Sequence, residues 1–318
     1  MAFTHTMLAK KALLLAKVEA EYGVDPTPVK TTDVVLAYDI ALMPEREVEP
    51  RPEEVASFGK LGTVVGKQTM GFSFKVTSPG GAVGVGEKAV ESALLQMCSM
   101  KETVGTAGSG ALYACETAVG KSATLWLYID GIVYKINGCK SDLTMRAVAG
   151  KAFELEFSGK GLYVAGVAEA FPITPTIPSG APMICKGLTM EIVSAVARVE
   201  TVELTLGNVI TVSSDVAVAT GVKEINITGR APKFTANPEV TPTQITTFES
   251  AIDTPTNVAC KLNLVAGTNG LQISIPKGFI DSAGLGEREG KEIMNLSVIP
   301  CQNTAIDDEI LFTYHKAA

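Results

Sequence analysis

The stretch FPITPTIPSGAP, residues Phe171–Pro182, lies near the midpoint of the 318-residue chain and contains four prolines. Proline fixes φ and has no backbone N–H, so we expect this stretch to lie in neither a helix nor a central strand. It could be a hinge between unrelated domains, a rigid loop within one domain, or a seam between two copies of one unit. The patterns on either side of it help to choose among these.

Strand patterns dominate the first half of the chain. Apolar and polar residues alternate in several segments that are rich in β-branched or aromatic residues, a period typical of strands with one buried face. Asp130-Gly131 separates two of these segments and predicts a tight hairpin turn. The predicted strands are Thr69–Val76, Ala123–Asp130, Ile132–Gly138 and Phe153–Gly159, and one helix is predicted over Glu87–Met100.

The second half shows a similar order of elements. A strand is followed by a helix, two strands joined by a turn, a polar connection and a last strand introduced by Gly-Lys, as in the first half. The predicted strands are Ala197–Gly207, Lys223–Gly229, Lys261–Gly267, Leu271–Gly278 and Ile293–Pro300, and the helix is predicted over Thr241–Ile252.

This recurring order predicts an internal duplication, because repeated self-similarity is the main sequence sign of a repeated architecture. We expect a first domain over residues 1–167, a proline-rich linker over 168–182 and a second domain over 183–318. Each domain is predicted to be a mainly β sandwich or barrel with one flanking helix. The halves share pattern more than identity, so chance similarity between two β-rich segments remains the alternative.

The composition favours a protein that assembles with other copies. Apolar residues make up 46% of the chain and charged residues only 19%, and the mean hydropathy is +0.25. Either a membrane protein or a subunit with large interfaces fits these values. No run of about 20 apolar residues occurs, and lysines interrupt the apolar N-terminal segment, so we predict neither a membrane span nor a signal peptide.

We find no sequence motif for catalysis, a cofactor or a metal. Gly120-Lys-Ser ends like a phosphate-binding loop, but Cys115 stands where that motif requires glycine. The six cysteines are scattered and form no C-x-x-C pair, and the net charge of −7 argues against a grip on nucleic-acid phosphates. We therefore predict a protein that is not an enzyme and has no cofactor or metal.

Charged residues cluster in PEREVEPRPEE, Pro44–Glu54. Paired carboxylates can perform acid/base chemistry when a cleft holds them at a fixed spacing. Here they alternate with arginines and prolines, which favours a charged, semi-extended loop that contacts solvent or another subunit. The candidate contact residues are Glu45, Arg46, Glu47, Arg51, Glu53 and Glu54.

Three segments resemble the major tail tube proteins of bacteriophages with long, non-contractile tails. They are LLLAKVEAEYGVDPTP (Leu13–Pro28), DVVLAYDIALMPEREVEPR (Asp33–Arg51) and AFPITPTIPSGAP (Ala170–Pro182). The resemblance implies a β-sandwich or partly closed barrel that assembles into stacked rings around a DNA-conducting lumen. Single-domain members of that family form hexameric rings, and duplicated members form trimeric rings with pseudo-sixfold symmetry.

The resemblance also implies a location and partners. We expect assembly in the host cytoplasm into the virion tail, with contacts to other copies, the tape measure protein and the tail terminator, and passage of DNA without specific binding. The candidate contact residues would then lie between rings. Two alternatives remain: a capsid decoration protein, and a carbohydrate-binding β-sandwich module, which the low aromatic content of 6% disfavours.

Overall fold

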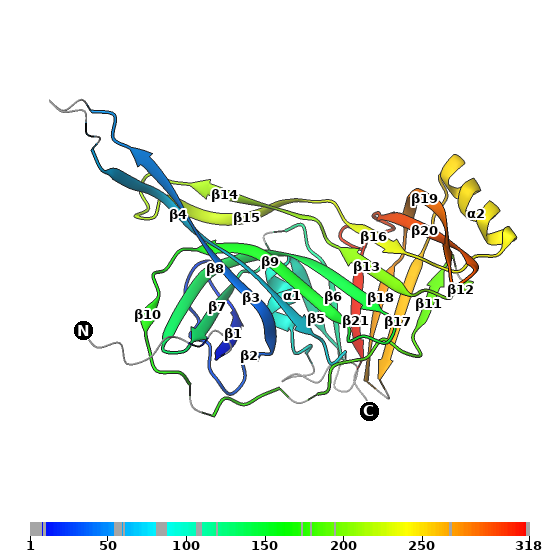
Figure 1. Ribbon diagram of the computed structural model, residues 1–318, viewed down its shortest axis with the longest axis horizontal. Coiled ribbons are helices and arrows are strands. Elements are labelled where there is room, and N and C mark those ends of the chain that lie inside the picture. The colour runs from blue at the N-terminus through cyan, green and yellow to red at the C-terminus, as the bar shows by residue number, and fades with distance from the viewer. Residues whose placement is uncertain are drawn as a thin grey trace.

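The computed structural model describes residues 8, 11–53, 59, 61–80, 88–105, 110–118, 120–172, 174–178, 180–193, 195–266 and 269–315. The chain is mainly β, as predicted, and its strands form two large antiparallel sheets and one separate hairpin (Figure 1). Within the described residues no sheet closes on itself. The alternating patterns that predicted strands therefore do belong to sheets with one buried face.

The larger sheet has twelve strands. From the first half come β1 (Ala12–Val18), β2 (Val34–Val35), β3 (Ala37–Pro50), β4 (Thr63–Thr77), β7 (Ala123–Ile129), β8 (Ile132–Val148), β9 (Glu154–Leu162) and β10 (Val167–Ala168). From the second half come β13 (Thr201–Thr205), β16 (Lys233–Ala236), β19 (Gly278–Arg288) and β20 (Lys291–Pro300). The long β8 pairs with β7 through its first part and with β9 and β13 through its second.

The smaller sheet has seven strands and also mixes both halves. Its order is β12 (Ala195–Ala197), β11 (Thr189–Ile192), β17 (Cys260–Ala266), β18 (Asn269–Ile275), β21 (Leu311–His315), β6 (Ala111–Cys115) and β5 (Met100–Val104). The separate hairpin consists of β14 (Asn208–Ser214) and β15 (Val222–Arg230). The helices are α1 (Ser92–Met97) and α2 (Pro242–Asp253).

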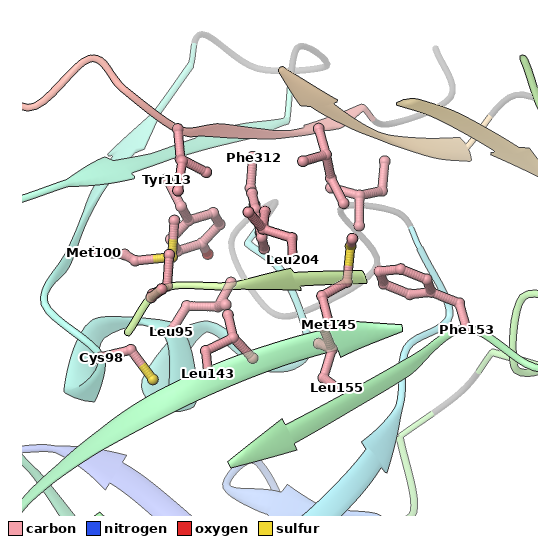
Figure 2. Close-up of a cluster of buried hydrophobic side chains, with 14 of the residues drawn as sticks. Leu95, Cys98, Met100, Tyr113, Leu143, Met145, Phe153, Leu155, Leu204 and Phe312 are labelled. Carbon is pink, nitrogen blue, oxygen red and sulfur yellow. The ribbon is translucent and has the colours of Figure 1, made fainter. Parts of the chain in front are cut away.

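The main core lies between the two large sheets. Leu143, Met145 and Leu155 from β8 and β9 point toward Tyr113 and Phe312 from β6 and β21 (Figure 2). All five side chains are buried. One hydrophobic cluster thus contains residues from both halves of the chain, and its burial holds the halves together.

The proline-rich stretch forms no helix or strand in its described residues, as predicted. It runs along the first half: the Glu169 N–H donates to the Gly131 carbonyl at 3.1 Å, and the Thr176 N–H donates to the Lys30 carbonyl at 2.9 Å. Phe171 packs edge-on against Tyr128, with 6.4 Å between ring centroids. The described part of the linker is therefore docked on the protein surface.

Several predicted elements have different bounds. The helix predicted over Glu87–Met100 is only α1, and Glu87 lies outside the described residues. The predicted helix over Thr241–Ile252 is confirmed as α2, which begins with a Thr241–Gln244 capping box. The polar connection before Gly290 is strand β19, and the charged segment predicted as a loop is strand as far as Pro50.

Candidate assembly surface

The two halves join through a strand pair. In the pairing of β8 with β13, Met145 lies opposite Leu204, and Thr144 lies opposite Thr205. The Thr144 and Thr205 hydroxyl oxygens are 3.2 Å apart. At the end of the pair, the Ala149 N–H donates to the Glu200 carbonyl at 2.8 Å. We call this β8–β13 pair the seam.

The seam sits inside a longer run of paired strands in the order β3-β4-β9-β8-β13-β16-β20-β19. At one end β3 pairs only with β4, and at the other end β19 pairs only with β20, among the described strands. Each end strand therefore has one edge that pairs with no other described strand, although α2 contacts β19. Edges of this kind favour pairing with another chain.

The face of this run that lies opposite the core carries interleaved charges. Arg146 Nε lies 2.7 Å from Glu203 Oε2 across the seam, and Arg146 Nη1 lies 3.5 Å from Glu156 Oε2. Lys75 Nζ lies 3.4 Å from Glu154 Oε1 on the neighbouring strand pair. Hydrogen bonding to Glu203 raises the pKa of Arg146, so the guanidinium is charged at all physiological pH values. The face is polar, with these cations and carboxylates in contact.

The β14–β15 hairpin, which we call the second arm, lies against β8 and β9. Its Asn208 is buried, and the Asn208 side-chain amide donates to the carbonyls of Cys98 and Ser141 at 3.0 and 3.1 Å. Farther along the arm, the Ile225 N–H donates to the Tyr22 hydroxyl at 2.6 Å. The second arm is thus seated on the first half of the chain.

The β3–β4 hairpin, which we call the first arm, projects beyond the sheets at the upper left of Figure 1. Most of its outer half is exposed, including Val48, Val64 and Val65. Exposed apolar side chains gathered on one projecting hairpin are typical of an interaction surface.

The predicted contact residues are distributed along the first arm. Glu45 lies near its base, where Lys160 Nζ donates to Glu45 Oε2 at 2.7 Å and, with Thr69, lowers the Glu45 pKa. Arg46 donates to the Tyr163 hydroxyl at 2.5 Å. The other described ones pair locally, Glu47 with Lys67 at 3.4 Å and Arg51 with Glu53 at 3.2 Å, and Glu54 lies outside the described residues.

A cleft of about 600 Å³ lies between β15 and the loops around residues 117 and 306. Burial lowers the pKa of Lys140 in its wall to about 8, and the Lys140 ammonium donates to the carbonyls of Gly120 and Lys121. The Arg230 guanidinium pairs with the Glu309 carboxylate, and Asp307 accepts hydrogen bonds from Thr117. These charged groups have protein partners that stabilise the loops.

In the described part of the chain, no three His, Cys, Asp or Glu side chains come close enough to hold a metal ion. None of the described helices is long and apolar enough to cross a membrane.

Sequence reasoning missed the β19 edge. Leu285 on β19 is 57% exposed although it lies opposite the buried Met294. The segment Gly284–Arg288 contains two glycines and two charged residues, so its alternation is weak and a loop was the natural prediction. The available signal was the second Gly-Lys pair, because Gly290 turns the chain from β19 into β20 as Gly150 turns it from β8 toward β9.

A family model described as phage tail tube protein matches residues 9–298. A search of curated proteins found no match. The open sheet, the unpaired end strands and the projecting arm are features of a subunit that assembles, and the family match covers nearly the whole chain. The chain belongs to the phage tail tube protein family and is a structural protein of the phage tail.

Proposed function

We propose that copies of this chain join edge to edge into rings, and that the rings stack into the tube that conducts DNA. The observation that carries this proposal is the run from β3 to β19, which has an unpaired strand at each end. Strand addition can continue such a sheet from copy to copy, because the two free edges lie at opposite ends of one subunit.

The order of strands within this run supports an internal duplication. The first unit is β3-β4-β9-β8, and the second unit is β13-β16-β20-β19. In each unit the first two strands are connected through an arm, the third is the last of the four along the chain, and the fourth leads into the third. With two units per chain, a trimeric ring would have pseudo-sixfold symmetry, and a hexameric ring is the alternative. The domain bounds 1–167 and 183–318 belong to this proposal, although strands of both halves share each large sheet.

The polar face of the run is our candidate for the lumen wall. Lys75 and Arg146 both contact carboxylates on it, so these two cationic groups are already paired within the subunit. DNA would pass such a wall without being held, because phosphate affinity rises with each lysine or arginine that it contacts.

The end of the first arm is our candidate for contacts between rings. Arg51 and Glu53 belong to its outer part. At its base Glu45 contacts β9, and Arg46 contacts Tyr163 just after β9. We assign the tape measure and tail terminator proteins as further partners, and the host cytoplasm as the place of assembly, because the chain belongs to a tail family.

Electron microscopy of the purified, concentrated protein tests this function. Hollow tubes built from stacked rings are expected. Compact particles would favour the capsid decoration alternative, and a protein that stays monomeric at high concentration would contradict assembly altogether. The exposed outer arm supplies a variant for comparison: deleting residues 48–65 should leave rings but weaken their stacking.

A further inference from the structure

The strand pairing at the seam within one chain indicates how two chains can pair with each other. The two units of the run are joined by β8 of the first unit and β13 of the second. In the second unit β19 corresponds to β8, and in the first unit β3 corresponds to β13. We propose that β19 of one copy pairs with β3 of the next copy in the register of the seam; this inference rests on the proposed function.

Two glycines align β8 with β19. Gly150 and Gly290 both have a φ of 76° and follow the two strands at their turns. Counting back from them makes Leu285 the counterpart of Met145 and Gly284 the counterpart of Thr144. The pairing partners agree, because Met145 lies opposite the buried Leu155 and Leu285 lies opposite the buried Met294.

Two phenylalanines align β3 with β13. Leu42 lies opposite Phe72, and Leu204 lies opposite Phe234. Both phenylalanines are buried in the core between the sheets. Leu42 is therefore the counterpart of Leu204, and Met43 is the counterpart of Thr205.

Exposure differs between these counterparts as the proposal requires. At the seam, Met145 is 0% exposed and Leu204 is 1% exposed. Their counterparts at the free edges are more exposed: Leu285 is 57% exposed, and Leu42 is half-buried. Pairing in the seam register places Leu42 of one copy opposite Leu285 of the neighbouring copy, so two apolar side chains would be covered together.

The arms differ in the same way. The second arm continues from β13 and lies on β8 and β9 of the first unit. The first arm continues along β3, and its outer strand residues are exposed. In the proposed register the base of the first arm would face β19 and β20 of the neighbouring copy, which is the surface that corresponds to the seat of the second arm. The end of the first arm would remain available to the next ring.

A disulfide cross-link tests the register. Thr144 and Thr205 are in contact across the seam, so their counterparts Gly284 and Met43 should meet across the contact between copies. Met43 is 50% exposed, and a Cβ at Gly284 would meet no atom within 4 Å. The test variant is therefore Met43→Cys with Gly284→Cys, in a Cys301→Ser background that removes the one native cysteine that is not buried.

The other five native cysteines are buried, and burial raises the pKa of each thiol, so they should stay unreactive during mild oxidation. Oxidised assemblies of the test variant should give a ladder of covalent dimers and trimers on denaturing gels, which reductant removes. The trimer should be the largest product if the ring is trimeric.

Three controls make the result decisive. Thr144→Cys with Thr205→Cys should form the corresponding bond within one chain, with no gain in mass. Met43→Cys with Gly286→Cys is shifted by one diagonal position, about 7–8 Å in a sheet, and should cross-link poorly. Ala41→Cys with Gly286→Cys is a second in-register pair and decides the question if the first pair disturbs assembly.

Tubes without cross-links in either in-register pair, while the seam pair closes, would overturn the proposed register and leave tube assembly standing. A stronger cross-link in the shifted pair than in the in-register pairs would also overturn it. Absence of tubes from the unmodified protein would instead refute the proposed function.

Discussion

Truncation to alanine should mainly affect folding at Met145 and mainly affect assembly at the corresponding position, Leu285. Met145 is 0% exposed in the core, and Leu285 is 57% exposed at the free edge. Met145→Ala removes a buried side chain and should lower the free energy of unfolding of the isolated subunit by about 2–5 kcal/mol. Leu285→Ala removes a side chain that is mostly in water, so the loss should stay within about 0.5 kcal/mol.

For subunits that are folded, Leu285→Ala should weaken assembly more than Met145→Ala does. Full burial of a leucine contributes roughly 1.5–3 kcal/mol, and more than half of the Leu285 side chain is still exposed in the subunit. Covering it between copies should add roughly 1–1.5 kcal/mol at each contact. Leu285→Ala should therefore raise the critical concentration for tube formation by about fivefold to tenfold.

Urea unfolding of the dilute, monomeric subunit measures the first effect, and sedimentation of tubes over a concentration series measures the second. Val216→Ala, at a fully exposed position on the loop between β14 and β15, is the control for both. The reasoning fails if Leu285→Ala destabilises the subunit as much as Met145→Ala does. It also fails if the critical concentration of Leu285→Ala equals that of the control.

Three further predictions concern the subunit itself and are measured by urea unfolding. The buried Glu19 carboxylate accepts hydrogen bonds from two backbone N–H groups and two hydroxyls. Glu19→Gln should therefore lower the free energy of unfolding by about 2 kcal/mol. A loss no greater than that of the exposed Glu21→Gln would contradict this. Burial raises the pKa of Glu91. The contribution of Glu91 to the free energy of unfolding should therefore fall as pH rises above about 4.3, and Glu91→Gln should gain stability relative to wild type over that range. A difference between the two proteins that does not depend on pH would count against this. Gly207 has a φ of 66°, and an added Cβ would lie 2.2 Å from a backbone carbonyl oxygen, so Gly207→Ala should cost roughly 1–3 kcal/mol, whereas Gly284→Ala should be nearly neutral.

Local signals predicted the strands well where one face is buried. The alternation in Ile132–Gly138 located the start of β8, and Asp130-Gly131 marked its hairpin, where both residues have positive φ. The turn predicted between the strands Lys261–Gly267 and Leu271–Gly278 lies partly outside the described residues, and Gly270 belongs to β18. The second part of β8 was hidden because polar residues such as Lys140 and Ser141 are buried there with hydrogen-bond partners.

Long-range pairing lay beyond the reach of the sequence. Nothing in the residues of β13 indicates that its partner is β8. The proline-rich stretch separates the two strands in the sequence, and no local turn connects them. The first arm was predicted as a loop since Pro44 and Pro50 interrupt its pattern. Prolines are tolerated in β3 because it is an edge strand. In the isolated subunit, no other strand requires backbone N–H donors from the unpaired edge of β3.

The candidate assembly surface was found only in part. Charge clustering located Glu45 to Glu53 on the first arm, but not their separation into a base and an exposed outer part. The β19 edge became visible only when its exposed Leu285 could be compared with the buried Met145. Such a comparison requires the structure, because the exposure of a residue on an edge strand depends on whether another strand pairs with that edge.

The central claim is that two corresponding units per chain build a ring by repeating one strand contact. The most direct measurement is the number of chains per ring, obtained from the cross-section and mass per length of tubes by electron microscopy. Our account predicts a trimeric ring in which six similar units surround the lumen. Six chains per ring would contradict the functional duplication, and separate subunits with no strand contact between them would contradict the assembly itself.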